Sequence, residues 1–221
     1  MTLVIRKQLK SALFRSIESR LSVYGFTLKT SKDSLVHRGE DTTDIFQLVC
    51  LDGKPSLDVQ PNVAIRNERV ERIFHKISGF DVKNQSTTPT VGGAIGVLLT
   101  EDARSCEFYL ESETEIMIVT DAIVQVFENF ALPYIKKYGS IHEIDLELNS
   151  NPHERSPHRA APWLRCSTGI IVAKLVGRSN FDQLSEIYSG IMINSANGFY
   201  FRKFNALLEV LQSIDVMGNG Q

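Results

Sequence analysis

The apolar residues of this 221-residue chain change their spacing near its midpoint. Up to about Leu110 they mostly alternate with polar residues, which is typical of β-strands with one dry face. After Glu113 they recur at helical spacing. The sequence therefore predicts an α+β protein: a mostly antiparallel sheet of about five or six strands packed by helices, with a helical C-terminal extension.

The first half of the chain predicts one helix and then strands. Apolar residues recur at helical spacing from Arg6 to Tyr24, and Gly25 ends that helix. Short polar turns then separate runs of strand character. The predicted strands are 26–30, 34–38, 44–51, 56–66, 91–100 and 105–111, with a short helix at 67–78.

The fourth predicted strand has the clearest pattern. Its apolar residues alternate with polar ones, so we expect them to face the core. Pro61 cannot donate to a strand ladder, which predicts an edge strand or a bulge at that point. The residues expected on the dry face are Leu57, Val59, Val63 and Ile65.

The second half predicts helices almost throughout. The segment from Glu113 to Tyr138 is so apolar that we expect it to be largely buried, and Pro133 is expected to kink it or to begin a new turn. Further helices are predicted at 141–148, 163–176, 181–193 and 198–214. We expect residues 1–138 to form the sheet domain with its packing helices, and residues 139–221 to add a helical extension to the same unit.

Composition limits the partners that we expect. With 24 basic and 26 acidic residues the net charge is −2, which favours neither nucleic acid nor a membrane as partner, and we see no segregation of charge. The N-terminus has charged residues too early for a signal peptide, and the apolar stretch 169–177 contains Lys174. A cytoplasmic protein is therefore expected. Its three cysteines are predicted to be buried, reduced thiols: Cys50, Cys106 and Cys166.

The glycines at 92, 93 and 96 lie in a stretch that resembles a phosphate-binding turn. No Lys-Ser or Lys-Thr follows them, and Val97-Leu98-Leu99 has strand character. We interpret the stretch as a structural turn or bulge; a flexible loop near a ligand is the alternative.

A proline-rich loop at 149–162 holds two histidines five residues apart. Zinc needs three or four ligands on a rigid frame, so no metal is predicted here, and no cofactor is predicted elsewhere. The loop is interpreted as a solvated connector or, because it is charged and stiffened by prolines, as a partner-binding loop. The candidate residues in it are His153, Glu154, Arg155, His158 and Arg159.

Carboxylates cluster where the last predicted strand meets the long helix, at Glu107, Glu111, Glu113 and Glu115. Acidic residues at a helix start are stabilised by the helix dipole, which accounts for much of the cluster. A pair of carboxylates in an acid–base site is one alternative, and contact with a basic partner is another. We take Glu111 and Glu113 as candidate partner-binding residues.

Three short motifs resemble a group of small bacterial α+β proteins of unknown function. They are Tyr24-Gly25-Phe26, the strand with Phe46-Gln47-Leu48, and Leu132-Pro133 with Tyr138. Proteins of this group are often encoded in toxin and immunity gene neighbourhoods. The resemblance, which extends to about Asn149, implies a protein that binds and blocks another protein, such as a toxin.

Three hypotheses about function follow. The first is a non-enzymatic protein-binding module, immunity- or antitoxin-like. The second is an enzyme of unrecognised type with a site between the sheet and the helical extension, using Glu111, Glu113 or His153. The third is a structural protein that forms homo-oligomers through its apolar C-terminal helices.

Overall fold

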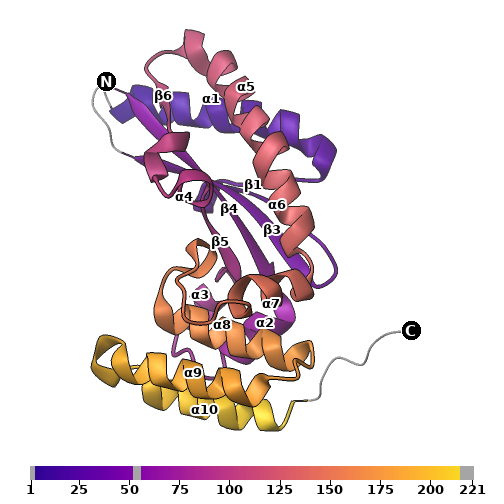
Figure 1. Ribbon diagram of the computed structural model, residues 1–221. Coiled ribbons are helices and arrows are strands. Elements are labelled where there is room, and N and C mark those ends of the chain that lie inside the picture. The colour runs from indigo at the N-terminus through magenta and orange to yellow at the C-terminus, as the bar shows by residue number, and fades with distance from the viewer. Residues whose placement is uncertain (1–2, 52–55, 215–221) are drawn as a thin grey trace. The chain divides into compact units, whose positions relative to one another are not determined.

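The computed structural model describes residues 3–51 and 56–214 of the chain, and its fold is α+β, as predicted (Figure 1). The chain divides into two compact units. Unit 1 consists of Met1–Ile65 and Gly92–Lys136, and unit 2 consists of Arg66–Val91 and Lys137–Gln221. Each unit is thus built from two separate stretches of the sequence.

The sheet lies almost wholly in unit 1. Its strands follow the order β1-β2-β3-β4-β5, and β6 pairs with β4. Three strand pairs are antiparallel: β1 with β2, β2 with β3, and β4 with β6. Leu35 lies opposite Phe46, and Leu57 lies opposite Leu110. The strands are β1 (Thr27–Lys29), β2 (Ser34–Arg38), β3 (Thr42–Leu51), β4 (Leu57–Asn67), β5 (Val91–Ala94) and β6 (Phe108–Leu110).

One face of this sheet forms the core of unit 1. The expectation for the fourth strand is confirmed, because its four apolar residues are at most 1% exposed. Helices α1 (Leu3–Leu21) and α5 (Ile116–Val126) pack against each other, and the ring of Phe127 lies 5.2 Å from those of Phe26 and Phe46. Aromatic contacts therefore connect the long helix to β3 and to the residue that precedes β1.

The long predicted helix is continuous from Glu113 to Tyr138. Ser112 and Glu115 form a capping box at its start, which satisfies backbone donors there. Pro133 does not end the helix. It lacks an N–H, and the wide π turn η5 (Phe127–Ala131) precedes it, followed directly by α6 (Leu132–Tyr138).

The prediction of a strand at 91–100 is wrong for residues 95–100. Strand β5 ends at Ala94, and α4 (Ile95–Thr100) follows. Gly92 has φ +147°, and a Cβ on it would lie 2.4 Å from the Val63 carbonyl oxygen, so only glycine lets these backbones approach so closely. The glycine-rich stretch is thus a close approach of two backbones, and the structural interpretation of it holds.

Unit 1 is completed by short helical turns. Ser105 donates to the Gly96 carbonyl at 3.3 Å, so the turn after α4 folds back on that helix. The remaining turns are η1 (Ser22–Tyr24), η2 (Thr30–Lys32), η3 (Ala103–Cys106) and η4 (Glu113–Glu115).

Unit 2 is helical and is built around α8 (Pro162–Leu175), eleven of whose residues are buried. Trp163 lies between Phe74 and Tyr200, with ring centroids 5.1 and 4.8 Å away. The predicted helices of the C-terminal part are present. The other elements are α2 (Glu68–Phe74), α3 (Val82–Gln85), α7 (Ile141–Asn149), η6 (Pro157–Arg159), α9 (Phe181–Asn194), η7 (Ala196–Gly198) and α10 (Phe201–Gln212).

A buried polar network joins α7, α8 and α9. The Asn149 side-chain amide donates to Asp145 at 2.6 Å and to the Gly169 carbonyl at 2.9 Å. The Tyr188 hydroxyl lies 3.0 Å from the Leu148 carbonyl oxygen and 2.5 Å from the Asn149 side-chain oxygen. Because these groups are buried, their mutual hydrogen bonds fix how the three helices meet.

Candidate binding surfaces

The proline-rich loop in unit 2 is only partly exposed. His153, Glu154 and Arg155 are exposed, as expected for a partner-binding loop. His158 and Arg159 differ from that expectation. The His158 ring lies 5.0 Å from the Tyr138 ring and its Nε2 is 3.4 Å from Glu147.

Arg159 is only 8% exposed, because its guanidinium reaches inward and donates to the Pro89 carbonyl at 2.6 Å. Both residues therefore hold the loop against its own unit. Three of the five loop candidates remain on the surface.

The carboxylates near the start of α5 divide into two kinds. The Glu115 carboxylate is engaged in hydrogen bonds within the chain, because it accepts from the backbone N–H groups of Glu111 at 2.7 Å and Ser112 at 3.2 Å. Glu107 accepts from the Tyr109 hydroxyl at 3.1 Å. The carboxylates of Glu111 and Glu113 are exposed and have no hydrogen-bond or ion-pair partner among residues 3–51 and 56–214.

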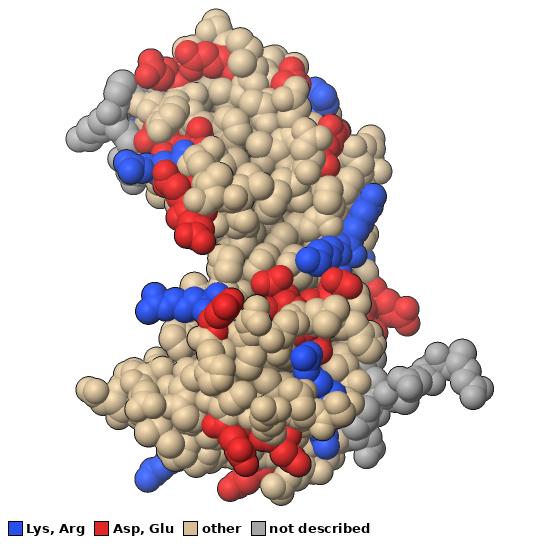
Figure 2. Space-filling view, viewed as in Figure 1, with Lys and Arg blue, Asp and Glu red and all other residues tan. Residues whose placement is uncertain are grey.

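Exposed apolar side chains lie next to these two carboxylates. Met117 is 59% exposed and Ile118 is 72% exposed in the first turn of α5. We call Glu111, Glu113, Met117 and Ile118 the α5 surface. Figure 2 shows acidic side chains, with other residues between them, in the part of unit 1 where α5 begins.

The long helix is less buried than its composition predicts. Its mean hydropathy is 1.4 over the most apolar stretch, yet only 33% of that stretch is buried, so the expectation of a largely buried helix is wrong. By length and composition this is the one helix in the described part of the chain that could cross a membrane. Polar contacts join this helix to α1 and η1: Arg20 donates to Asp121 at 2.7 Å, and the Tyr24 hydroxyl donates to Glu128 at 2.9 Å.

Charge is segregated along the chain, contrary to expectation. Residues 1–32 contain seven basic residues and one acidic residue, whereas residues 101–128 contain eight acidic residues and one basic residue. Both stretches belong to unit 1, which therefore has a basic part as well as the acidic part that includes the α5 surface. Counting charges in windows would have revealed this from the sequence.

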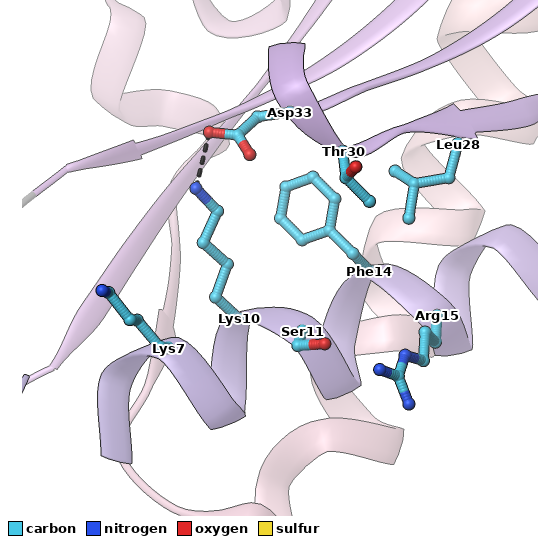
Figure 3. A pocket seen from close by; sticks show the side chains of 8 residues that line it. All are labelled: Lys7, Lys10, Ser11, Phe14, Arg15, Leu28, Thr30 and Asp33. Carbon is cyan, nitrogen blue, oxygen red and sulfur yellow. Dashed lines mark hydrogen bonds and ion pairs between the residues drawn. The ribbon is translucent and has the colours of Figure 1, made fainter. Parts of the chain in front are cut away.

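The basic part includes a groove of about 270 Å³ along α1 (Figure 3). Phe14 and Leu28 supply apolar lining, and Lys10 is bound to Asp33 at 2.6 Å. Lys7 and Arg15 carry charges with no ion-pair partner among the described residues. The groove is lined by Lys7, Lys10, Ser11, Phe14, Arg15, Leu28, Thr30 and Asp33.

A buried charged cluster in unit 2 was not predicted. The Glu71 carboxylate is fully buried and accepts from the hydroxyls of Thr88 at 2.7 Å and Thr90 at 2.9 Å. Burial raises the pKa of Glu71, and the nearby Arg159 and Arg66 guanidinium groups oppose that shift. No sequence motif predicts this cluster, because its members come from separate parts of the sequence.

His75 borders the same cluster. Its Nε2 is 2.7 Å from the Thr88 hydroxyl and its Nδ1 is 3.0 Å from the Ser78 hydroxyl. If Thr88 donates to Glu71, the ring must donate from Nε2, and in the neutral imidazole Nδ1 then accepts from the Ser78 hydroxyl. Burial, assisted by the positive charge of Arg66, lowers the pKa of His75 and favours that neutral form.

Of the residues named for the enzyme hypothesis, Glu111 and Glu113 belong to unit 1 and His153 belongs to unit 2. Among the described residues no group of three His, Cys, Asp or Glu side chains could hold a metal ion. Comparison with protein-family models, with curated proteins and with solved structures finds no match to this chain. Function must therefore be argued from the surfaces themselves.

Proposed function

We propose that this protein is a non-enzymatic protein-binding module that binds a basic partner protein through the α5 surface. The observation that carries the proposal is the exposure of Met117 and Ile118 beside two unpaired carboxylates, Glu111 and Glu113. Protein interfaces commonly have an apolar centre and a polar rim, and the α5 surface has both.

The apolar pair supplies the affinity in this proposal. Burying a large aliphatic side chain contributes about 1.5–3 kcal/mol, so Met117 and Ile118 together could contribute several kcal/mol to a complex. The carboxylates of Glu111 and Glu113 determine the specificity for a partner in this proposal. Exposed charges mainly raise the association rate and select against partners of like charge, which favours a partner with basic residues around an apolar patch.

A lipid surface suits the α5 surface less well. Anionic headgroups would meet Glu111 and Glu113. The same helix carries Asp121 and Glu128, which are bound to Arg20 and Tyr24. We therefore propose a protein partner in the cytoplasm.

The finer proposal is an immunity- or antitoxin-like inhibitor of a toxin, and its support is the resemblance of three motifs. Those motif residues have structural roles here: Gly25 takes φ +79° in a turn, and Tyr24 and Phe26 contact Phe127. The motifs thus support a related fold, and the α5 surface is what supports binding.

The test is co-purification followed by a binding measurement. The tagged full-length chain is recovered from its own cells as wild type, as Met117→Ser/Ile118→Ser, and as the control Ile193→Ser/Phe199→Ser. The control residues are 52% and 72% exposed and lie in unit 2. A protein recovered with wild type and control is then purified, and its Kd is measured by calorimetry.

We expect the α5 double variant to raise Kd by about a hundredfold, since about 3 kcal/mol of apolar burial is lost. The control should leave Kd unchanged. Glu111→Gln/Glu113→Gln should slow association and weaken its dependence on salt. Recovery of the chain alone would contradict the proposal, and a homo-oligomer lost in the Ile193→Ser/Phe199→Ser variant would favour the oligomer hypothesis instead.

A further inference from the structure

An open pocket of about 530 Å³ lies beside the buried cluster of unit 2. Its volume is in the range of small-molecule sites. Half of its lining residues come from α2 and α3, and four of its side chains are basic or titrate as bases. The lining residues are Arg66, Glu68, Arg72, His75, Lys76, Val82, Gln85 and Ser86.

Arg66 is a fixed donor at this pocket. Its side chain is 7% exposed, its Nε donates to Glu68 at 2.9 Å, and its Nη1 donates to the Thr88 carbonyl and hydroxyl at 2.8 Å. The remaining nitrogen, Nη2, has no hydrogen-bond partner in the described part of the chain. It is not among the solvent-inaccessible polar atoms without a partner, so a ligand can reach it.

The charges around the pocket favour an anion. Arg72 on α2 and Lys76 just after that helix are exposed, and neither has an ion-pair partner among the described residues. Glu68 is bound to Arg66, and the buried Glu71 faces Arg66 at 3.8 Å and is also offset by Arg159. Positive charge is therefore in excess at the pocket mouth.

We propose that this pocket binds the phosphate group of a small phosphate monoester. The preformed guanidinium of Arg66 would donate from Nη2, and Arg72 and Lys76 would close on the other oxygens. A phosphate dianion suits this set, because its oxygens can accept from several charged donors at once. The space beyond the phosphate accommodates the rest of a small molecule, between Val82 and Gln85.

The site is independent of the α5 surface, because all of its residues belong to unit 2. Failure of one proposal therefore leaves the other intact.

The experiment is calorimetric titration of the full-length protein at constant ionic strength with inorganic phosphate and with ribose 5-phosphate. Arg72→Gln/Lys76→Gln removes two charges from the pocket. Arg155→Gln/Arg202→Gln removes two exposed charges in unit 2 that do not line the pocket and is the matched control.

We expect saturable binding, with Kd raised about tenfold or more in the pocket variant, because a charge-assisted hydrogen bond contributes about 1.5 kcal/mol or more. The control should retain the wild-type Kd. In NMR titrations of the wild type, the pKa of His75 should rise when phosphate binds, since a nearby anion stabilises the imidazolium.

Three results would overturn the proposal. These are the absence of saturable binding, an equal loss of binding in both double variants, and a His75 pKa that phosphate leaves unchanged. Binding of inorganic phosphate with rejection of ribose 5-phosphate would overturn the assignment to a monoester.

Discussion

Substitution of Gly169 by alanine should destabilise unit 2, although alanine is the better helix former. Gly169 lies in the interior of α8, and a Cβ there would be 2.8 Å from the Asn149 side-chain oxygen and 2.9 Å from the Tyr188 hydroxyl. Both of those atoms belong to the buried network between α7, α8 and α9. Neither can move without breaking a buried hydrogen bond.

The expected magnitude follows from three opposing effects. Glycine to alanine in a helix interior gains about 1 kcal/mol. Overpacking a filled site costs about 1–3 kcal/mol, and leaving a buried polar group without its partner costs about 1–3 kcal/mol. We therefore expect Gly169→Ala to lower the free energy of unfolding by about 1–5 kcal/mol.

Gly190 provides the matched control. It lies in α9, and a Cβ there would meet nothing within 4 Å, so only the helix propensity changes. Gly190→Ala should raise the free energy of unfolding by about 0.5–1 kcal/mol. Two glycine-to-alanine substitutions in one unit are thus expected to have opposite signs.

Urea unfolding followed by tryptophan fluorescence measures both variants. Trp163 is the single tryptophan of the chain and lies in α8, so its emission reports on unit 2. A Gly169→Ala protein as stable as wild type would refute the packing argument. So would a loss of the same size in Gly190→Ala, because a general effect of alanine would then explain both.

Three further predictions concern the cysteines, the α5 cap and the histidine at the pocket. At about pH 8, Cys50 should react with a thiol reagent first, because it is half-buried. Cys166 should react only on unfolding, because burial raises its pKa to about 12. Equal reaction rates of the two cysteines in the native protein would contradict this. Ser112→Ala removes the helix cap and should cost about 1 kcal/mol, seen as faster hydrogen exchange in α5; unchanged exchange would contradict it. Burial lowers the pKa of His75 below its usual value near 6.5, so the unfolded state binds more protons than the folded state as the pH falls through that value. Wild type should therefore lose stability relative to His75→Gln as the pH falls below about 6.5, and parallel stability curves would rule this out.

The sheet could be predicted because its pattern is local. Alternation in β4 placed Leu57 and Val59 on the dry face, and both are buried. The segment 95–100 was mistaken for a strand because Val97, Leu98 and Leu99 have strand character on their own. What decides their conformation is the close packing at Gly92 and Gly96, which depends on partners elsewhere in the fold.

The binding surfaces could be predicted only in part. Acidic residues near the start of α5 were recognisable, and the structure adds that Glu111 and Glu113 lack partners while Glu115 is used in the cap. The cluster at Glu71 could not be anticipated, because it depends on Arg159, which approaches it only in the folded chain. Charge and burial of distant residues decide such sites, and neither is encoded in local spacing.

Site-specific photocrosslinking in the cells that make this protein tests the binding proposal most directly. A photoreactive phenylalanine analogue would replace Ile118 on the α5 surface in one variant and Ile193 on α9 in another. The account predicts a single adduct with a basic protein at position 118, and none at position 193. No adduct at position 118, or the same adducts at both positions, would contradict it.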